Sequence, residues 1–164
     1  MTYLLIAFVL AIILSPLMWF RQSPRQKLIT AMRQEAAVKG LRVKLSKPAD
    51  AREGEGRLEY VTYTCPWNPG SDPSVEPRME KWLLLKETHR GDPSPWAGWQ
   101  WMGRESNDSL VSGIGSALEK LPKDVIALEA NSQGVRIYWK ERGDLNDVGV
   151  VGHQLSVLRD AIRN

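Results

Sequence analysis

Cysteine is almost missing from this sequence, since Cys65 is the one cysteine among 164 residues. A single thiol cannot form an intrachain disulfide, so a packed core must hold the fold, and a reducing compartment suits the chain. Histidine is nearly as scarce, with two residues. Cys65, His89, Asp92 and His153 follow none of the spacings by which proteins bind zinc. We therefore predict no metal ion and no other cofactor.

Cys65 is nevertheless the residue from which an enzymatic alternative starts. A cysteine thiolate becomes a nucleophile beside a base, and His89 or His153 could take that role. Pro66 follows Cys65 directly, and the pair belongs to no catalytic motif, whereas a lone cysteine is commonly a small buried hydrophobe. A non-catalytic protein is therefore favoured, and an enzyme that uses Cys65 or an unidentified carboxylate is the alternative.

Charge is absent from the first twenty residues, which end at Arg21. A helix of roughly 20 apolar residues crosses a bilayer core of about 30 Å. A cleaved signal peptide needs a positive start and small residues at its cleavage site, whereas this stretch closes on Trp19 and Phe20. A helix of a soluble domain normally shows a polar face. Residues 1–20 are therefore predicted to form a single transmembrane helix.

Positive charge is concentrated directly after this stretch. Residues 21–44 hold seven Lys and Arg against one Glu, a net charge of +6, so the +3 of the whole chain leaves −3 for residues 45–164. Basic flanks stay on the cytoplasmic side, which places the N-terminus outside and the following domain in the cytoplasm, at a bacterial inner (plasma) membrane. Arg21, Arg25 and Lys27 are expected at anionic lipid headgroups. Nucleic acid is not expected as a partner, because the domain is acidic.

Residues 21–40 predict a basic juxtamembrane helix. Ser23 suits the N-cap, Pro24 suits the first helical position, and Gly40 suits the position just past the end. Apolar residues recur along this segment at helical spacing. The apolar stripe could lie on the bilayer surface or pack on the domain that follows. Its short, alanine-rich character favours packing on the domain.

Residues 41–164 predict one α+β domain. Strands that are grouped in runs, and do not alternate with helices, indicate a mostly antiparallel sheet with helices on one face. The clearest signal is a hairpin, in which a short turn containing Gly134 joins two apolar strands. The expected strands are residues 41–45, 57–65, 80–87, 95–102, 125–130 and 135–140, and the expected helices are residues 107–121 and a last helix from 146 or 147 onward.

Tryptophan is abundant, with seven residues, and several lie in segments that are rich in proline. Residues 65–77 hold four prolines, and such stiff irregular segments make poor central strands. Core packing is one role for the indoles. The other is a recognition surface, since tryptophan is enriched at protein interfaces. We predict that Trp67, Trp96 and Trp99 bind a partner, with Trp67 and Trp96 at least partly exposed, and that Trp82 and Trp139 are buried.

The layout of the first forty residues is a short outer N-terminus, one span and a basic flank. It resembles the small accessory subunit of the bacterial preprotein translocase (YajC-like), and that resemblance implies a non-catalytic partner of a membrane complex. No catalytic site is visible elsewhere, and function must be argued from a site. We predict a membrane-tethered protein–protein interaction module, an accessory or assembly subunit of an inner-membrane complex whose partner is an integral membrane protein. The alternative is a membrane-anchored enzyme.

Overall fold

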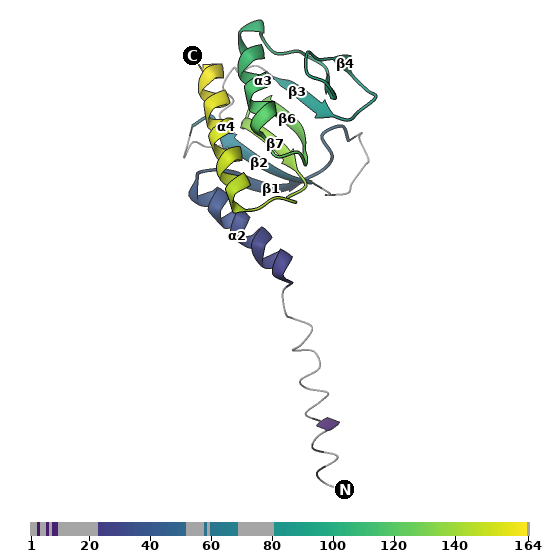
Figure 1. Ribbon diagram of the computed structural model, residues 1–164, viewed down its shortest axis with the longest axis vertical. Coiled ribbons are helices and arrows are strands. Elements are labelled where there is room, and N and C mark those ends of the chain that lie inside the picture. The colour runs from purple at the N-terminus through teal and green to yellow at the C-terminus, as the bar shows by residue number, and fades with distance from the viewer. Residues whose placement is uncertain are drawn as a thin grey trace.

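Seven strands and three α-helices make up the part of the chain that the structure describes (Figure 1). The structure is a computed structural model, and it describes residues 3, 6, 8, 9, 23–51, 58, 60–68 and 81–163. In chain order the elements are α2 (Pro24–Val38), β1 (Arg42–Ser46), β2 (Tyr60–Pro66), β3 (Trp82–Lys86), β4 (Asp92–Pro93), β5 (Trp99–Trp101), the 3-10 helix η1 (Asp108–Leu110), α3 (Val111–Lys120), β6 (Val125–Asn131), β7 (Gly134–Trp139) and α4 (Leu145–Arg163).

The seven strands form one sheet in the order β1-β2-β7-β6-β3-β5-β4, and all neighbours pair antiparallel. The α+β class and the antiparallel sheet are therefore confirmed. The predicted hairpin is β6–β7, where Gly134 has a φ of 148° and closes the turn. The strand expected over residues 95–102 is shorter, because only Trp99–Trp101 pair with β3. The preceding residues Asp92–Pro93, which belong to none of the expected strands, form β4.

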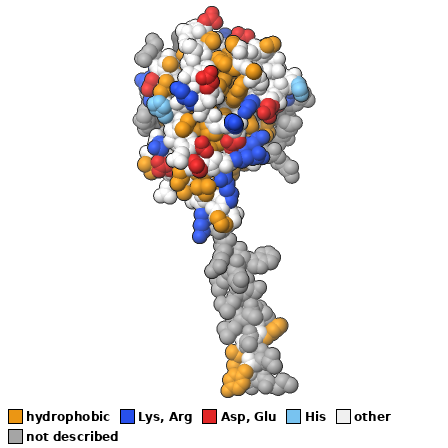
Figure 2. Space-filling model, viewed as in Figure 1, with side chains coloured by type: hydrophobic (Ala, Val, Ile, Leu, Met, Phe, Trp, Pro, Cys, Tyr) orange, Lys and Arg blue, Asp and Glu red, His pale blue; other side chains and the backbone are white. Residues whose placement is uncertain are grey.

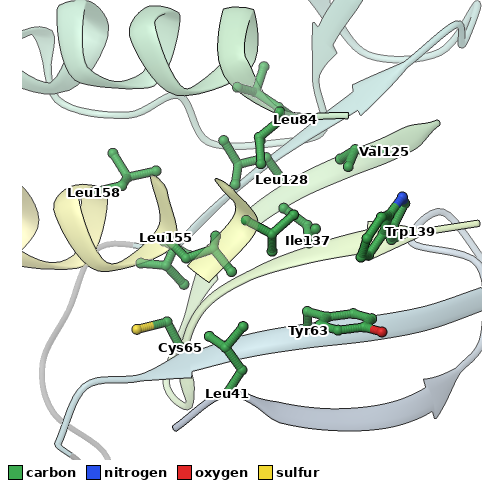
Figure 3. Packing of buried hydrophobic residues seen from close by; sticks show 14 of the residues in the cluster. Leu41, Tyr63, Cys65, Leu84, Val125, Leu128, Ile137, Trp139, Leu155 and Leu158 are labelled. Carbon is green, nitrogen blue, oxygen red and sulfur yellow. The ribbon is translucent and has the colours of Figure 1, made fainter. Parts of the chain in front are cut away.

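All three helices cover one face of the sheet, and the main core lies between them. Buried side chains of α2, α3 and α4 join those of five strands in one hydrophobic cluster, and the partly buried Val43 of β1 packs against it. Figure 3 shows Leu155 and Leu158 of α4 beside Leu128 and Ile137 of the sheet, in one continuous cluster. Trp82 and Trp139 belong to this cluster, so their predicted burial is confirmed. Helix α2 is thus packed against the helix-covered face of the sheet through the same core as α3 and α4.

The opposite face of the sheet carries a small cluster around Tyr138. Its hydroxyl group accepts a hydrogen bond from Arg136 Nη2 at 2.8 Å and donates one to Glu129 Oε2 at 2.9 Å. Arg136 Nε also donates to the same carboxylate oxygen at 2.7 Å. Burial first, and the charge of Glu129 second, raise the pKa of Tyr138 to about 12. Tyr138 therefore stays protonated at neutral pH and stabilises the middle of this face.

Helix α2 forms as its capping residues predict. Ser23 Oγ accepts from the Gln26 backbone at 3.2 Å, and Gln26 Oε1 accepts from the Ser23 backbone at 2.9 Å, which is a capping box. Gly40, with a φ of 77°, ends the helix. Met32 of α2 is fully buried in the core. Of the two placements that the sequence left open, α2 takes the one packed on the domain.

The structure contradicts the predicted transmembrane helix. Among the residues that it describes, no helix is both long enough and apolar enough to cross a membrane. Of residues 1–20, only Tyr3, Ile6, Phe8 and Val9 are described, and the rest of that prediction lies outside the described residues. The prediction rested on the apolar length of this stretch, on its lack of a polar face and on the absence of signal-peptide features. The membrane, single-pass and inner-membrane assignments are corrected with it, while the orientation and location inferred from the span stay predictions.

Candidate functional site

A groove lies between helix α2 and strand β1, with a volume of about 470 Å³. Arg33, Gln34 and Ala37 line it from the helix. Val43, Lys44 and Leu45 line it from β1, and Val61 lines it from β2. Valine, leucine and alanine side chains therefore make most of its walls, whereas Arg33 and Gln34 supply polar side chains.

The turn between α2 and β1 creates this groove. The Gly40 backbone N–H donates to Ala37 O at 3.0 Å, and the Leu41 N–H donates to Ala36 O at 2.9 Å. This pair of bonds is a Schellman motif, which needs a residue of positive φ directly after the helix. Glycine adopts that conformation without strain. The chain therefore reverses at Gly40, and β1 runs back beside the helix that precedes it.

Strand β1 is an open edge of the sheet. It is the first strand in the sheet order, and among the described residues no strand pairs with its outer side. It is five residues long and contains no proline. Its register with β2 places Val43 opposite Tyr63 and Leu45 opposite Val61, on the face that the helices cover. Leu45 is nevertheless 58% exposed, since α2 covers this end of the sheet incompletely.

The other edge of the sheet has a different character. Strand β4 is two exposed residues long, and one of them is Pro93. Short edge strands and prolines are the features by which proteins keep sheet edges from pairing with other chains. The two edges are therefore unequal, because β4 is blocked, whereas β1 lies beside an apolar groove and no described strand pairs with its outer side.

A buried carboxylate fastens α2 beside the groove. Arg33 donates to Glu141 through Nε at 2.9 Å and through Nη2 at 2.6 Å, and Tyr63 OH donates to Glu141 Oε1 at 2.8 Å. The hydrogen bond to Glu141 is the main cause that raises the pKa of Arg33, and burial is the main cause that raises the pKa of Tyr63. Arg33, which lines the groove, is therefore held in one position.

Arg25 makes a second contact between α2 and the segment around Glu141. Its guanidinium donates to the backbone oxygen of Glu141, and its Nη1 donates to Gly143 O at 3.0 Å. Arg25 was expected at lipid headgroups together with Arg21 and Lys27. Lys27 is exposed on α2, and Arg21 lies outside the described residues. In the structure Arg25 therefore joins the start of α2 to the connection between β7 and α4.

The predicted tryptophan surface is only partly present. Trp67 was expected to be exposed, but it is 3% exposed and its Nε1 donates to Asn131 O at 2.7 Å. Asn131 is the last residue of β6. The proline-rich sequence around Trp67 gives no sign of this contact, because Asn131 is distant along the chain. Trp96 and Trp99 are half-buried, and Trp96 packs edge-on against Trp101 with ring centroids 5.8 Å apart. Trp67 follows β2 and its indole contacts the end of β6, whereas Trp99 lies on β5 and Trp96 packs against Trp101 of β5.

Cys65 lies in the core and does not form a catalytic pair. It is buried, and Arg159 Nη1 donates to its Sγ at 3.4 Å. Burial raises the pKa of the Cys65 thiol, although the charge of Arg159 acts in the opposite direction. His89 and His153 are both exposed. Within the described ranges, no three His, Cys, Asp or Glu side chains are placed to hold a metal ion.

No family model, curated protein or solved structure matches the chain. The resemblance to the translocase accessory subunit therefore stays a prediction. The groove itself was missed by sequence reasoning, as were Arg33, Tyr63 and Glu141. The available signal was the alternating strand Leu41–Leu45 directly after a helix-ending glycine, because a strand that follows its helix so closely must lie next to it.

Proposed function

We propose that this chain is a non-catalytic protein-interaction module, an accessory or assembly subunit that holds an extended segment of a partner protein along β1. The observation that carries the proposal is the open edge of β1 beside the apolar groove under α2. An extended peptide can add a strand to such an edge, where main-chain hydrogen bonds give affinity and pockets for alternate side chains give specificity.

The dimensions of the site suit this mode of binding. Five strand residues extend over about 16 Å, so a partner segment of about five residues would pair along the whole of β1. Alternate side chains of that segment would point to the helix-covered side, against Val43, Leu45 and Ala37. Burying apolar side chains there contributes about 25 cal/mol per Å² of area removed from water. The remaining side chains would point to the opposite side of the sheet.

The ties between α2 and the rest of the domain support a preformed site. Arg33, Tyr63 and Glu141 fix the helix wall of the groove before any partner arrives. A site that is already ordered loses less entropy on binding than one that orders at that moment. The enzymatic alternative has less support, because the buried thiol of Cys65 has a raised pKa and is protonated at neutral pH.

A selection from a displayed library of random ten-residue peptides tests the proposal on the full chain. Peptides selected on the natural chain should lose binding to Ala37→Trp, in which a large exposed side chain fills the groove. The matched control is Val38→Trp, since Val38 is 79% exposed on the same helix and does not line the groove. Selected peptides that bind all three chains equally would show that the groove is not the binding site.

A further inference from the structure

The charges around β1 indicate which kind of segment the groove receives. Residues 23–46 hold six Lys and Arg and one Glu, whereas residues 45–164 have a net charge of −3. Lys and Arg side chains lie over α2, at the end of the folded body where the chain enters it (Figure 2). Of these cations, Arg33 is paired with Glu141 and Lys39 with Glu35. Lys44 is exposed and supplies a positive charge on β1 itself.

Resting on the proposed function, we infer that the occupant of the groove is an acidic extended segment of a partner protein, with apolar and acidic residues in alternation. Val43 and Leu45 point to the helix-covered side of β1, and Arg42 and Lys44 point to the other side. Cross-strand neighbours share a face of the sheet, and opposite charges facing each other stabilise the pairing. A segment paired with β1 would thus place apolar residues in the groove and acidic residues beside Lys44.

A second copy of this chain fits the same edge poorly. An antiparallel pairing of two β1 strands centred on their middle residue would place Lys44 opposite the Lys44 of the other copy. Like charges that face each other across two strands are destabilising. Lysine on an edge strand is also a recognised means of preventing two identical edges from pairing. The same side chain that disfavours self-association favours an acidic partner.

Three labelled seven-residue peptides test the inference on the full chain by fluorescence anisotropy. All three have valine at alternate positions, and the other positions are Glu, Thr or Lys. We expect the Glu peptide to bind most tightly and the Lys peptide most weakly. We also expect the advantage of the Glu peptide over the Thr peptide to shrink when NaCl is raised from 50 to 300 mM, because salt screens exposed charges.

Reversing the charge of Lys44 tests directly whether this side chain determines the order of the three peptide affinities. Lys44→Glu should weaken the Glu peptide about tenfold and strengthen the Lys peptide, because a facing attraction becomes a repulsion. Lys120→Glu, which changes the net charge equally on the exposed end of α3, should leave the order of the three peptides unchanged. An order that stays the same in Lys44→Glu overturns the acidic partner.

The remaining outcomes separate this inference from the function on which it rests. If the three peptides bind equally and Ala37→Trp abolishes binding, the groove takes extended segments of any charge, and only the acidic partner is overturned. If binding is absent or indifferent to Ala37→Trp, both proposals fail. If the chain forms a dimer that Ala37→Trp dissociates, the second copy is the occupant and the inference is wrong.

Discussion

Glu141 combines a buried carboxylate with a backbone conformation that non-glycine residues rarely adopt. Its φ is 51°, and the residue is 4% exposed. Such a conformation costs about 1–3 kcal/mol and persists only where surrounding contacts over-determine it. Here the contacts come from Arg33, Tyr63 and Arg25. The residue thus stabilises the joint between α2 and the β7–α4 connection, and it holds Arg33, which lines the groove between α2 and β1.

Substituting either partner of the ion pair between Arg33 and Glu141 tests this role. Arg33→Met should lower the free energy of unfolding by about 2 kcal/mol, less than for a fully buried pair, because Arg33 remains partly exposed. Glu141→Met should be at least as costly, since Arg33 and Tyr63 then lose their acceptor. The double variant should be less destabilised than the sum of the two single variants, as double-mutant cycles measure. Additive losses in urea unfolding would contradict a direct interaction.

Tyr138 predicts a specific dependence of stability on alkaline pH. Its pKa is raised from 10.0 to about 12. A raised pKa gives stability that is fully present below the pKa of the unfolded chain and is lost as pH rises towards the folded value. Between pH 10 and about 12, the natural chain should lose about 1.4 kcal/mol more per pH unit than Tyr138→Phe. Urea unfolding at several pH values measures both slopes, and equal slopes would refute the buried phenol.

Trp67 shows how burial changes the meaning of a substitution. Because the indole is buried and hydrogen-bonded to Asn131, Trp67→Ala should destabilise the fold by about 3–5 kcal/mol, as Trp139→Ala should. Trp96→Ala, at a half-buried position, should be milder. Thermal unfolding of the three variants makes the comparison. A Trp67→Ala chain that melts like the natural one would return Trp67 to the surface role that the sequence suggested.

At the scale of the elements, the helix ends and the hairpin were predicted correctly from local signals, and the order of the strands in the sheet was not predicted. The cap at Ser23, the glycine at Gly40 and the turn at Gly134 fix their elements through neighbours in sequence, so α2 and the β6–β7 hairpin were predictable. The order of strands depends on contacts between distant segments. The sequence therefore could not show that β1 would be an edge, or that Asp92–Pro93 would form the strand β4. The groove depends on that order and was missed with it.

Deletions separate the contribution of α2 from that of the residues before it. Deleting residues 1–20 should leave a chain that folds cooperatively, because the described core lies between residues 23 and 163. Deleting residues 1–40 removes the buried side chains of Met32 and Ala36 and leaves Glu141 without Arg33. That chain should be less stable by at least about 3 kcal/mol. Equal denaturant midpoints for the two chains would show that α2 is dispensable.

At the scale of the whole molecule, the fold class was predictable and the membrane span was not upheld. Grouped strands and patterned helices gave the antiparallel α+β domain, since hydrophobic periodicity reports directly on which faces are buried. The interpretation of the first twenty residues rested on their apolar length, their lack of a polar face and the absence of signal-peptide features. No helix among the described residues meets the requirements of a span. The contrast in charge between residues 23–46 and the remaining domain survives as the feature that orients the proposed partner.

Hydrogen exchange at β1 tests the central claim most directly. When the alternating Glu and Val peptide binds the full chain, backbone amides within residues 42–46 should exchange more slowly, because a new strand accepts their outward hydrogen bonds. The Asp92 amide of β4, the blocked edge, should exchange as before, and Pro93 has no amide hydrogen to exchange. Slower exchange at β1 that Ala37→Trp abolishes is the result that the account predicts. A peptide that binds and leaves the exchange of residues 42–46 unchanged would contradict it.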